Sequence, residues 1–219
     1  AIAACILLLW PNTSLKTQYF HNQGKIFGTY YNIRYQSTED LHDFILTTLQ
    51  QVDHSLSMFN SNSVISKVNR NDSVLLDSLF ITMYNEAQGI SQLSNGAFDI
   101  TVAPLVHAWG FGKNIENRSQ IPTPLIDSIQ EFVGYQLLSL IGNQIVKSDP
   151  RTTLDASAIA KGFACDIVAN ALRKQGCENL LVDIGGEVVM LGVNDKGNPW
   201  KVGISKPKSN GEGMDNTLQ

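Results

Sequence analysis

The sequence predicts an α+β fold with mixed helices and a largely antiparallel sheet. Two hydrophobic patterns support this prediction: a spacing of three to four residues, typical of amphipathic helices, and short runs of β-branched and aromatic residues, typical of strands. Several strands come in pairs around turn residues such as Gly142-Asn143, which favours hairpins. The strands do not alternate with helices as a parallel βαβ array would require, so we expect antiparallel pairing.

The composition limits the class of protein. The chain has 219 residues, of which 43% are hydrophobic and 16% are charged, with a net charge of −4. These values are typical of one large globular domain and exclude a disordered chain or a polytopic membrane protein. The sequence has no long basic run, so no nucleic-acid partner is expected. The three cysteines, Cys5, Cys165 and Cys177, share no CxxC spacing, which disfavours a zinc site or a disulfide framework.

The first residues suggest a membrane tether. Ala1 to Trp10 are apolar and are followed by Pro11-Asn12. Ten residues cannot span the ~30 Å of hydrocarbon in a bilayer, so we interpret residues 1–17 as the remnant of an export or anchor segment and a linker. Two other interpretations stay open: Ile2-Ala3-Ala4-Cys5 resembles a lipoprotein cleavage box, which would place a lipid on Cys5, and the run could be a buried first strand. An anchor would place the protein in the bacterial cell envelope, on the periplasmic side of the inner membrane.

Three elements are predicted in the first half of the folded region. Residues 18–35 indicate a hairpin, because aromatic and β-branched residues flank two glycines there. Residues 41–56 follow helical spacing, and Glu39-Asp40 places favourable negative charge before the helix N-terminus. A second helix is predicted over residues 78–93, ending before an Asn-Gly pair.

The second half is predicted to contain further helices and hairpins. Two prolines introduce a short helix that runs to residue 132, a hairpin covers residues 135–146, and a long helix covers residues 155–174, with Gly176 in the C-cap region. The remaining predicted elements are strands over residues 180–184, 188–193 and 200–204, and an exposed polar tail or loop over residues 206–219.

One cluster of unusual residues, 94–112, could hold a planar ligand. Its glycines allow close approach of the backbone, Asp99 and Thr101 offer polar oxygens, and Trp109 and Phe111 offer flat apolar faces. A structural turn followed by core aromatic residues would give the same pattern, so both interpretations stay open.

A second cluster could hold a phosphate. Asp155 is predicted as the N-cap of the long helix, the small residues 156–160 leave its first N–H groups uncovered, and Lys161 supplies a cation. An ordinary N-cap with a surface lysine would explain the same spacing. Further along, Gly185-Gly186 ends a buried strand, which fits either a ligand contact or a plain turn.

Together, these clusters resemble the ApbE family of FAD:protein FMN transferases in order and composition. The resemblance extends from about residue 24 to residue 207. It rests on these segments: Gly28-Thr29, Ser57-Met58-Phe59, residues 63–69, residues 96–105, Trp109-Gly110-Phe111-Gly112, residues 155–166, Gly185-Gly186 and residues 200–207.

The resemblance implies a Mg²⁺-dependent enzyme that cleaves the pyrophosphate of FAD. It would transfer FMN to a Thr or Ser hydroxyl of a target protein, such as a subunit of a membrane redox complex, and release AMP. Phe59 stands where many relatives have Tyr. The resemblance assigns no catalytic residue, but it implies that seven residues bind the flavin or the rest of FAD: Phe27, Phe59, Ala97, Phe98, Asp99, Asp155 and Lys161.

The resemblance also implies a metal site to which Ala158 contributes its backbone carbonyl, a hard oxygen ligand of the kind that Mg²⁺ prefers. Other family segments that complete this site do not occur in the sequence, so the remaining ligands are expected beyond Gln219. We therefore interpret residues 18–219 as the N-terminal two thirds of a flavin transferase domain, with an ApbE/T-fold-like architecture that is incomplete at the C-terminus. We expect these residues alone to be inactive.

Three alternative functions remain open from the sequence. The same pocket could use water as the nucleophile and hydrolyse FAD to FMN and AMP. It could bind flavin without any chemistry, or the chain could be a structural envelope domain that binds no flavin. These alternatives differ in AMP release and flavin retention, which the sequence does not reveal.

Overall fold

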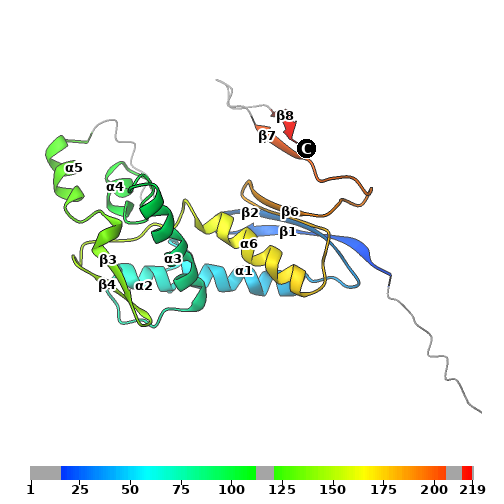
Figure 1. Ribbon diagram of the computed structural model, residues 1–219, viewed down its shortest axis with the longest axis horizontal. Helices are drawn as coiled ribbons and strands as arrows, with labels where there is room; N and C mark the ends of the chain where they lie inside the picture. The colour runs from blue at the N-terminus through cyan, green and yellow to red at the C-terminus, as the bar shows by residue number, and fades with distance from the viewer. Residues whose placement is uncertain (1–15, 112–120, 206–213, 219) are drawn as a thin grey trace, which may run out of the picture.

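The computed structural model describes residues 16–111, 121–205 and 214–218, and it confirms the α+β class (Figure 1). Its main sheet has four strands in the order β1-β2-β5-β6, and every neighbouring pair is antiparallel. The strands of this sheet are β1 (Gln18–Ile26), β2 (Thr29–Ser37), β5 (Leu180–Ile184) and β6 (Glu187–Leu191).

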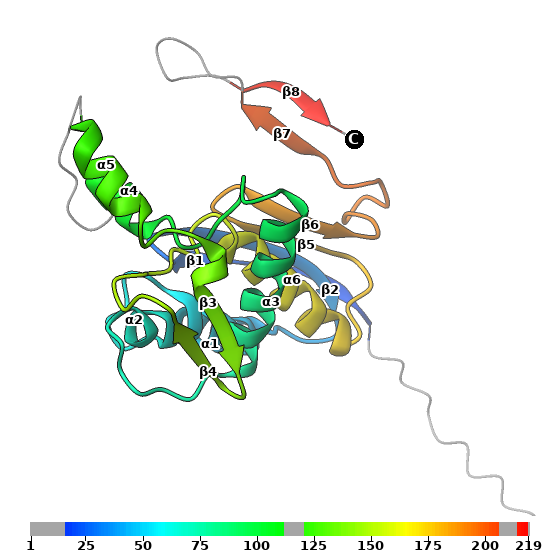
Figure 2. The same ribbon diagram turned by 60° about the vertical axis from the view of Figure 1, so that its left-hand side comes forward.

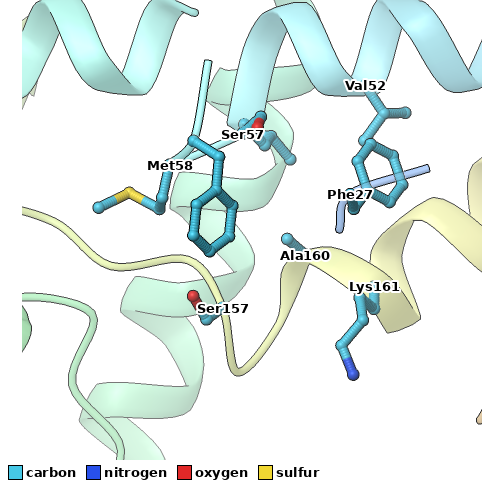
Figure 3. A pocket seen from close by; sticks show the side chains of 9 residues that line it. Phe27, Val52, Ser57, Met58, Ser157, Ala160 and Lys161 are labelled. Atoms are coloured by element: carbon cyan, nitrogen blue, oxygen red, sulfur yellow. The ribbon is translucent and has the colours of Figure 1, made fainter. Parts of the chain in front are cut away.

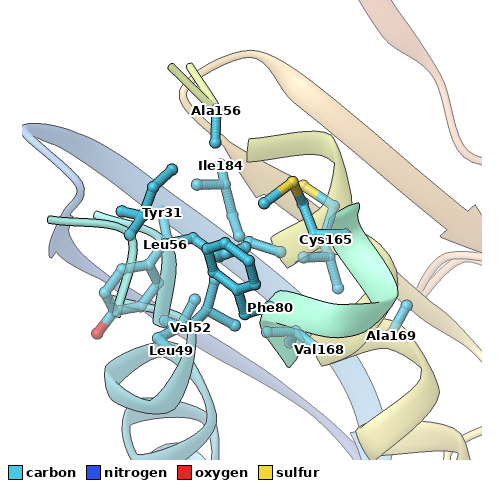
Figure 4. Close-up of a cluster of buried hydrophobic side chains, with 14 of the residues drawn as sticks. Tyr31, Leu49, Val52, Leu56, Phe80, Ala156, Cys165, Val168, Ala169 and Ile184 are labelled. Atoms are coloured by element: carbon cyan, nitrogen blue, oxygen red, sulfur yellow. The ribbon is translucent and has the colours of Figure 1, made fainter. Parts of the chain in front are cut away.

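Helices α1 (His42–Leu56) and α6 (Ala160–Lys174) pack on one face of this sheet (Figure 1). The alternation along β5 shows the two faces: Leu180, Val182 and Ile184 are fully buried, whereas the side chains between them are half-buried. The core between sheet and helices is apolar and continuous (Figure 4), and its labelled members are Tyr31, Leu49, Val52, Leu56, Phe80, Ala156, Cys165, Val168, Ala169 and Ile184.

Two tight turns lie side by side at one end of the sheet. Phe27-Gly28 joins β1 to β2, and Gly185-Gly186 joins β5 to β6. All four residues have positive φ, from 54° to 95°, as a two-residue turn of type I′ requires. The N–H of Gly185 donates to the carbonyl of Tyr30 at 2.9 Å. A Cβ at Gly185 would come within 2.8 Å of Thr29, so both the conformation and the close approach require glycine there.

A second group of elements lies around the C-terminal end of α1. Helices α4 and α5 lie next to each other there, beyond α3 and the β3–β4 hairpin (Figure 2). The bounds are α2 (Val64–Asn69), α3 (Ser78–Leu93), α4 (Ala103–Ala108), α5 (Thr123–Gln130), the 3-10 turn η1 (Tyr135–Leu137), β3 (Leu138–Ile141) and β4 (Gln144–Lys147). Strands β7 (Val202–Ser205) and β8 (Met214–Leu218) pair as a separate antiparallel sheet.

Most predicted elements are confirmed, and two differ. The predicted helix over residues 155–174 begins only at Ala160, because the N–H of Asp155 donates to the carbonyl of Ile100 at 2.6 Å and holds residues 155–159 in a loop. The polar tail after residue 206 contains strand β8, which pairs with β7. The short helices α2 and α4 were not predicted.

The predicted tether, residues 1–17, lies almost wholly outside the described residues. Among residues 16–111, 121–205 and 214–218, no helix combines the length and the apolar character that crossing a bilayer would require.

Candidate functional site

A cavity of about 250 Å³ opens where the β1–β2 turn, the end of α1 and the start of α6 meet (Figure 3). Its walls are largely apolar, with two serine hydroxyls and one lysine. The residues that line it are Phe27, Val52, Leu56, Ser57, Met58, Phe59, Ser157, Ala160 and Lys161. Three residues that the resemblance assigns to FAD, namely Phe27, Phe59 and Lys161, therefore come together from distant parts of the chain.

Phe27 lines this cavity from a strained backbone position. Its φ of 54° lies in the left-handed region, which is unusual for a bulky residue. The two-residue turn imposes this conformation and places the ring beside Val52 (Figure 3). Strain of this kind concentrates at functional sites, so the ring is a candidate ligand contact.

Phe59 supplies a second aromatic face, and it is 63% exposed. The segment that carries it, residues 57–59, follows α1 directly and is fixed by the start of α2. Ser63 donates its hydroxyl hydrogen to the carbonyl of Ser57 at 2.7 Å and accepts from the N–H of Ser66 at 3.1 Å. An exposed ring on a fixed segment is suited to stacking on a planar ligand.

Lys161 lies in the first turn of α6, at the edge of the cavity (Figure 3). Its Nζ forms an ion pair with Oε1 of Glu187 at 2.6 Å, and the two side chains are 34% and 41% exposed. The other carboxylate oxygen of Glu187, Oε2, is buried and has no hydrogen-bond partner within the described ranges. Glu187 therefore sits next to the candidate phosphate site with one unsatisfied oxygen.

The loop before α6 forms the third side of the cavity. Asn69 of α2 holds this loop: it accepts from the N–H of Leu154 at 2.7 Å and donates to the carbonyl of Leu154 at 2.8 Å. Asp155 does not cap α6, which corrects the prediction, because its carboxylate accepts from the N–H of Ser157 at 2.7 Å. Asp155 does not line the cavity either, whereas Ser157 does (Figure 3).

Ala97, Phe98 and Asp99 are also absent from the lining of this cavity. Asp99 holds its own loop together instead. One carboxylate oxygen accepts from the N–H and hydroxyl of Thr101, both at 2.7 Å, and the other accepts from the N–H of Tyr135 at 2.7 Å. Phe98 is partly buried against the main core.

The metal prediction rests on the carbonyl of Ala158. The described backbone contains no donor to this carbonyl, since α6 begins two residues later and its first turn bonds elsewhere. A free hard oxygen fits Mg²⁺. Over the same ranges, His, Cys, Asp and Glu side chains form no group of three that could hold a metal. The ligands expected beyond Gln219 lie outside the described residues.

Several residues of the site were not assigned from the sequence. Val52 and Leu56 line the cavity as the apolar end of α1, and Ser57 and Met58 line it next to Phe59. The segment 57–59 was noted for its resemblance, and this could have suggested Ser57 and Met58. No sequence signal links Glu187 to Lys161, because 26 residues separate them.

Comparisons with known proteins show the family of the chain. Residues 27–219 match the model of the ApbE family. A protein of Vibrio cholerae named FAD:protein FMN transferase is 33% identical over 216 residues, which cover 94% of this chain and 64% of the relative. The Escherichia coli K12 protein of the same name is 31% identical, and the match covers 84% of this chain and 56% of that protein. The chain thus spans less than two thirds of the length of these relatives.

Solved structures give the same result for the fold. The flavin transferase ApbE of Vibrio cholerae has a TM-score of 0.81 at 32% identity and covers 91% of this chain and 68% of its own. The ApbE protein of Thermotoga maritima has a TM-score of 0.80 at 26% identity, and the match covers 92% of this chain and 67% of that protein. The fold and the family model agree, and the chain belongs to the ApbE family.

Proposed function

We propose that the protein of which this chain forms part is an FAD:protein FMN transferase. It would break the pyrophosphate bond of FAD, attach FMN to a Thr or Ser hydroxyl of an acceptor protein and release AMP. Family membership and the names of the relatives support this proposal. Acceptors such as subunits of membrane redox complexes, and an N-terminal tether to the periplasmic side of the inner membrane, are part of the same proposal.

The observation that carries the proposal is the meeting of two aromatic faces and one cation in a single cavity. Phe27 and Phe59 offer apolar surface suited to the isoalloxazine ring. Lys161 lies in the first turn of α6, where the positive end of the helix dipole favours an anion. The cavity thus combines the two kinds of contact that a flavin phosphate needs.

The chain's own residues would bind and orient FAD. The aromatic faces would fix the ring, and Lys161 would hold the pyrophosphate near the loop that carries Ala158. Mg²⁺, when bound, would neutralise negative charge on the phosphate oxygens. Ala158 would contribute a carbonyl to it. Ala97, Phe98, Asp99 and Asp155 remain proposed FAD contacts.

A transfer assay tests the function. FAD and Mg²⁺ are incubated with the product of the complete gene, with and without an acceptor peptide that contains a Thr, and AMP and peptide-bound flavin are quantified. The transferase predicts AMP and peptide-bound flavin in equal amounts. AMP and free FMN without peptide-bound flavin would indicate the hydrolase, whereas retained FAD without AMP would indicate a binding protein.

The same assay on residues 1–219 tests the expectation of inactivity. Flavin binding without AMP release is expected, because the described residues contain no group of three His, Cys, Asp or Glu side chains that could hold a metal. Turnover comparable to that of the complete gene product would contradict this expectation.

A further inference from the structure

Glu187 does not line the cavity itself, but it is an acidic residue in contact with Lys161, the cation proposed to bind phosphates. It begins β6, directly after the Gly185-Gly186 turn, and its carboxylate lies 2.6 Å from Nζ of Lys161. Negative charge next to the cation weakens the pull of that cation on an anionic ligand. The ion pair therefore needs an explanation beyond anion binding.

The pair is not arranged for maximum stability. Oε2 of Glu187 is shielded from solvent and has no partner within the described parts of the chain, although the side chain as a whole remains 41% exposed. A buried oxygen without a hydrogen bond costs free energy, and such groups are rare in folded proteins. A stabilising ion pair would satisfy both oxygens, so the arrangement points to a functional role.

The backbone keeps Glu187 in this place. The thiol of Cys165 donates to its carbonyl at 3.1 Å, and Glu187 pairs with Ile184 across the β5–β6 hairpin. Burial raises the pKa of the Cys165 thiol to about 12, and the charges of Glu187, Asp166 and Asp183 add to this effect. The neighbourhood of the carboxylate is therefore negative, and Lys161 is the cation that contacts it.

We propose that Glu187 is a specificity-determining residue that makes the phosphate site favour a diphosphate diester over a phosphate monoester. This inference rests on the proposed placement of the FAD pyrophosphate at Lys161. FAD and FMN both carry about two negative charges at pH 8, but FAD spreads them over two phosphorus atoms, whereas FMN concentrates them on one. The carboxylate repels the concentrated charge more strongly, and Oε2 gains no hydrogen bond from a deprotonated phosphate.

The consequence concerns the order of affinities. The Lys161–Glu187 pair attracts a diphosphate diester such as FAD moderately. It adds little to the affinity of the site for a phosphate monoester. AMP, the monoester that the proposed transfer releases, would then leave the site readily, and free FMN, which forms only if water replaces the acceptor hydroxyl, would do the same. The residue acts through charge at the ligand's phosphate and takes no part in bond breaking.

Equilibrium titrations at pH 8 with riboflavin, FMN and FAD test this proposal in wild type and in Glu187→Gln, which keeps the shape and removes the charge. We expect FMN to bind about tenfold more tightly to Glu187→Gln, equivalent to ~1.4 kcal/mol. FAD should gain less, and riboflavin, which has no phosphate, should not change. Glu187→Asp should restore most of the discrimination against FMN.

Asp183→Asn is the matched control, because it removes a nearby negative charge from a residue that instead accepts the N–H of Gly186 at 3.0 Å. It should leave the ratio of FMN to FAD affinity unchanged. If Glu187→Gln does not fold, the affinities of wild type for FMN and riboflavin test the proposal instead. Wild type should bind FMN at most a few times more tightly than riboflavin.

Three results would overturn the proposal. The first is an unchanged ratio of FMN to FAD affinity in folded Glu187→Gln. The second is an equal change for all three ligands, which would indicate a reshaped cavity. In wild type, FMN binding at least as tight as FAD binding would be the third. If wild type bound none of the flavins, the proposed function would fail as well, and this outcome is distinct from the other three.

Discussion

Asn69 and Leu154, which are 85 positions apart in the sequence, are joined by two hydrogen bonds between one side-chain amide and one backbone unit. The amide of Asn69 accepts from the N–H of Leu154 at 2.7 Å and donates to its carbonyl at 2.8 Å, much as a neighbouring strand would. Leu154 is fully buried. This pair ties α2 to the loop that forms one side of the cavity.

Replacing Asn69 should therefore affect both stability and binding. Asn69→Ala leaves the backbone groups of Leu154 unpaired, which should cost about 1–3 kcal/mol of folding free energy. For a chain of this size each kcal/mol lowers the melting temperature by about 2–4 °C. Flavin affinity should also fall, because the loop with Ser157 loses its anchor. Asn62 is exposed and bonds to Asn60 through its backbone N–H, which alanine keeps, so Asn62→Ala provides the control. Equal melting temperatures for the two variants would refute this account.

Two substitutions of Phe27 separate the effect of backbone strain on stability from the effect of the aromatic ring on flavin binding. Phe27→Gly and Phe27→Ala both remove the aromatic ring, but only glycine adopts φ of 54° without strain. Phe27→Gly should thus be more stable than Phe27→Ala by about 1 kcal/mol. Both variants should lose flavin affinity to a similar degree. Thermal unfolding and flavin titration measure the two effects, and unchanged flavin affinity in both variants would remove Phe27 from the site.

The start of α1 should make stability depend on pH in the acidic range. Burial alone would raise the pKa of Asp40, but hydrogen bonds from Tyr35 and Asn22 and from the N–H of His42 hold it below its usual value. A lowered pKa in the folded state contributes stability above the unfolded value of 3.8, and this contribution is lost as pH falls through the folded value.

The test compares Asp40→Asn with wild type by thermal unfolding between pH 3 and pH 7. The variant should melt at a lower temperature at pH 7, and the difference should shrink toward pH 3 as wild type loses its contribution. Asp43→Asn is the control, because the described structure gives the Asp43 side chain no hydrogen bond, so its effect should be smaller. A constant difference between Asp40→Asn and wild type over the whole range would contradict the assignment.

The sequence predicted the regular elements well where the local pattern decides the structure. The bounds of α3 agree at both ends, because Asp77 caps the helix by accepting from the N–H of Phe80 and the Asn-Gly pair ends it in the left-handed region. The helix over residues 64–69 has only six residues, too few for a hydrophobic period. Its capping residue Ser63 was the available signal.

Tertiary hydrogen bonds explain the main error. Residues 155–159 are small and helix-compatible in sequence, but the N–H of Asp155 bonds to Ile100 and its carboxylate bonds to Ser157. These contacts hold a loop where the local pattern favours a helix. For the same reason the sequence could name Lys161 as a candidate, but it could not reveal the pairing with Glu187, which depends on how β6 and α6 meet.

The most direct test of the account is whether the charge of Lys161 binds the FAD phosphates. FAD and riboflavin are titrated against wild type, Lys161→Met and Lys174→Met, the last being a control at the other end of α6. A charge-assisted contact predicts that Lys161→Met weakens FAD binding about tenfold or more and leaves riboflavin binding unchanged. Lys174→Met should bind both ligands with the affinity of wild type. An FAD affinity of Lys161→Met equal to that of wild type would contradict the proposed phosphate site.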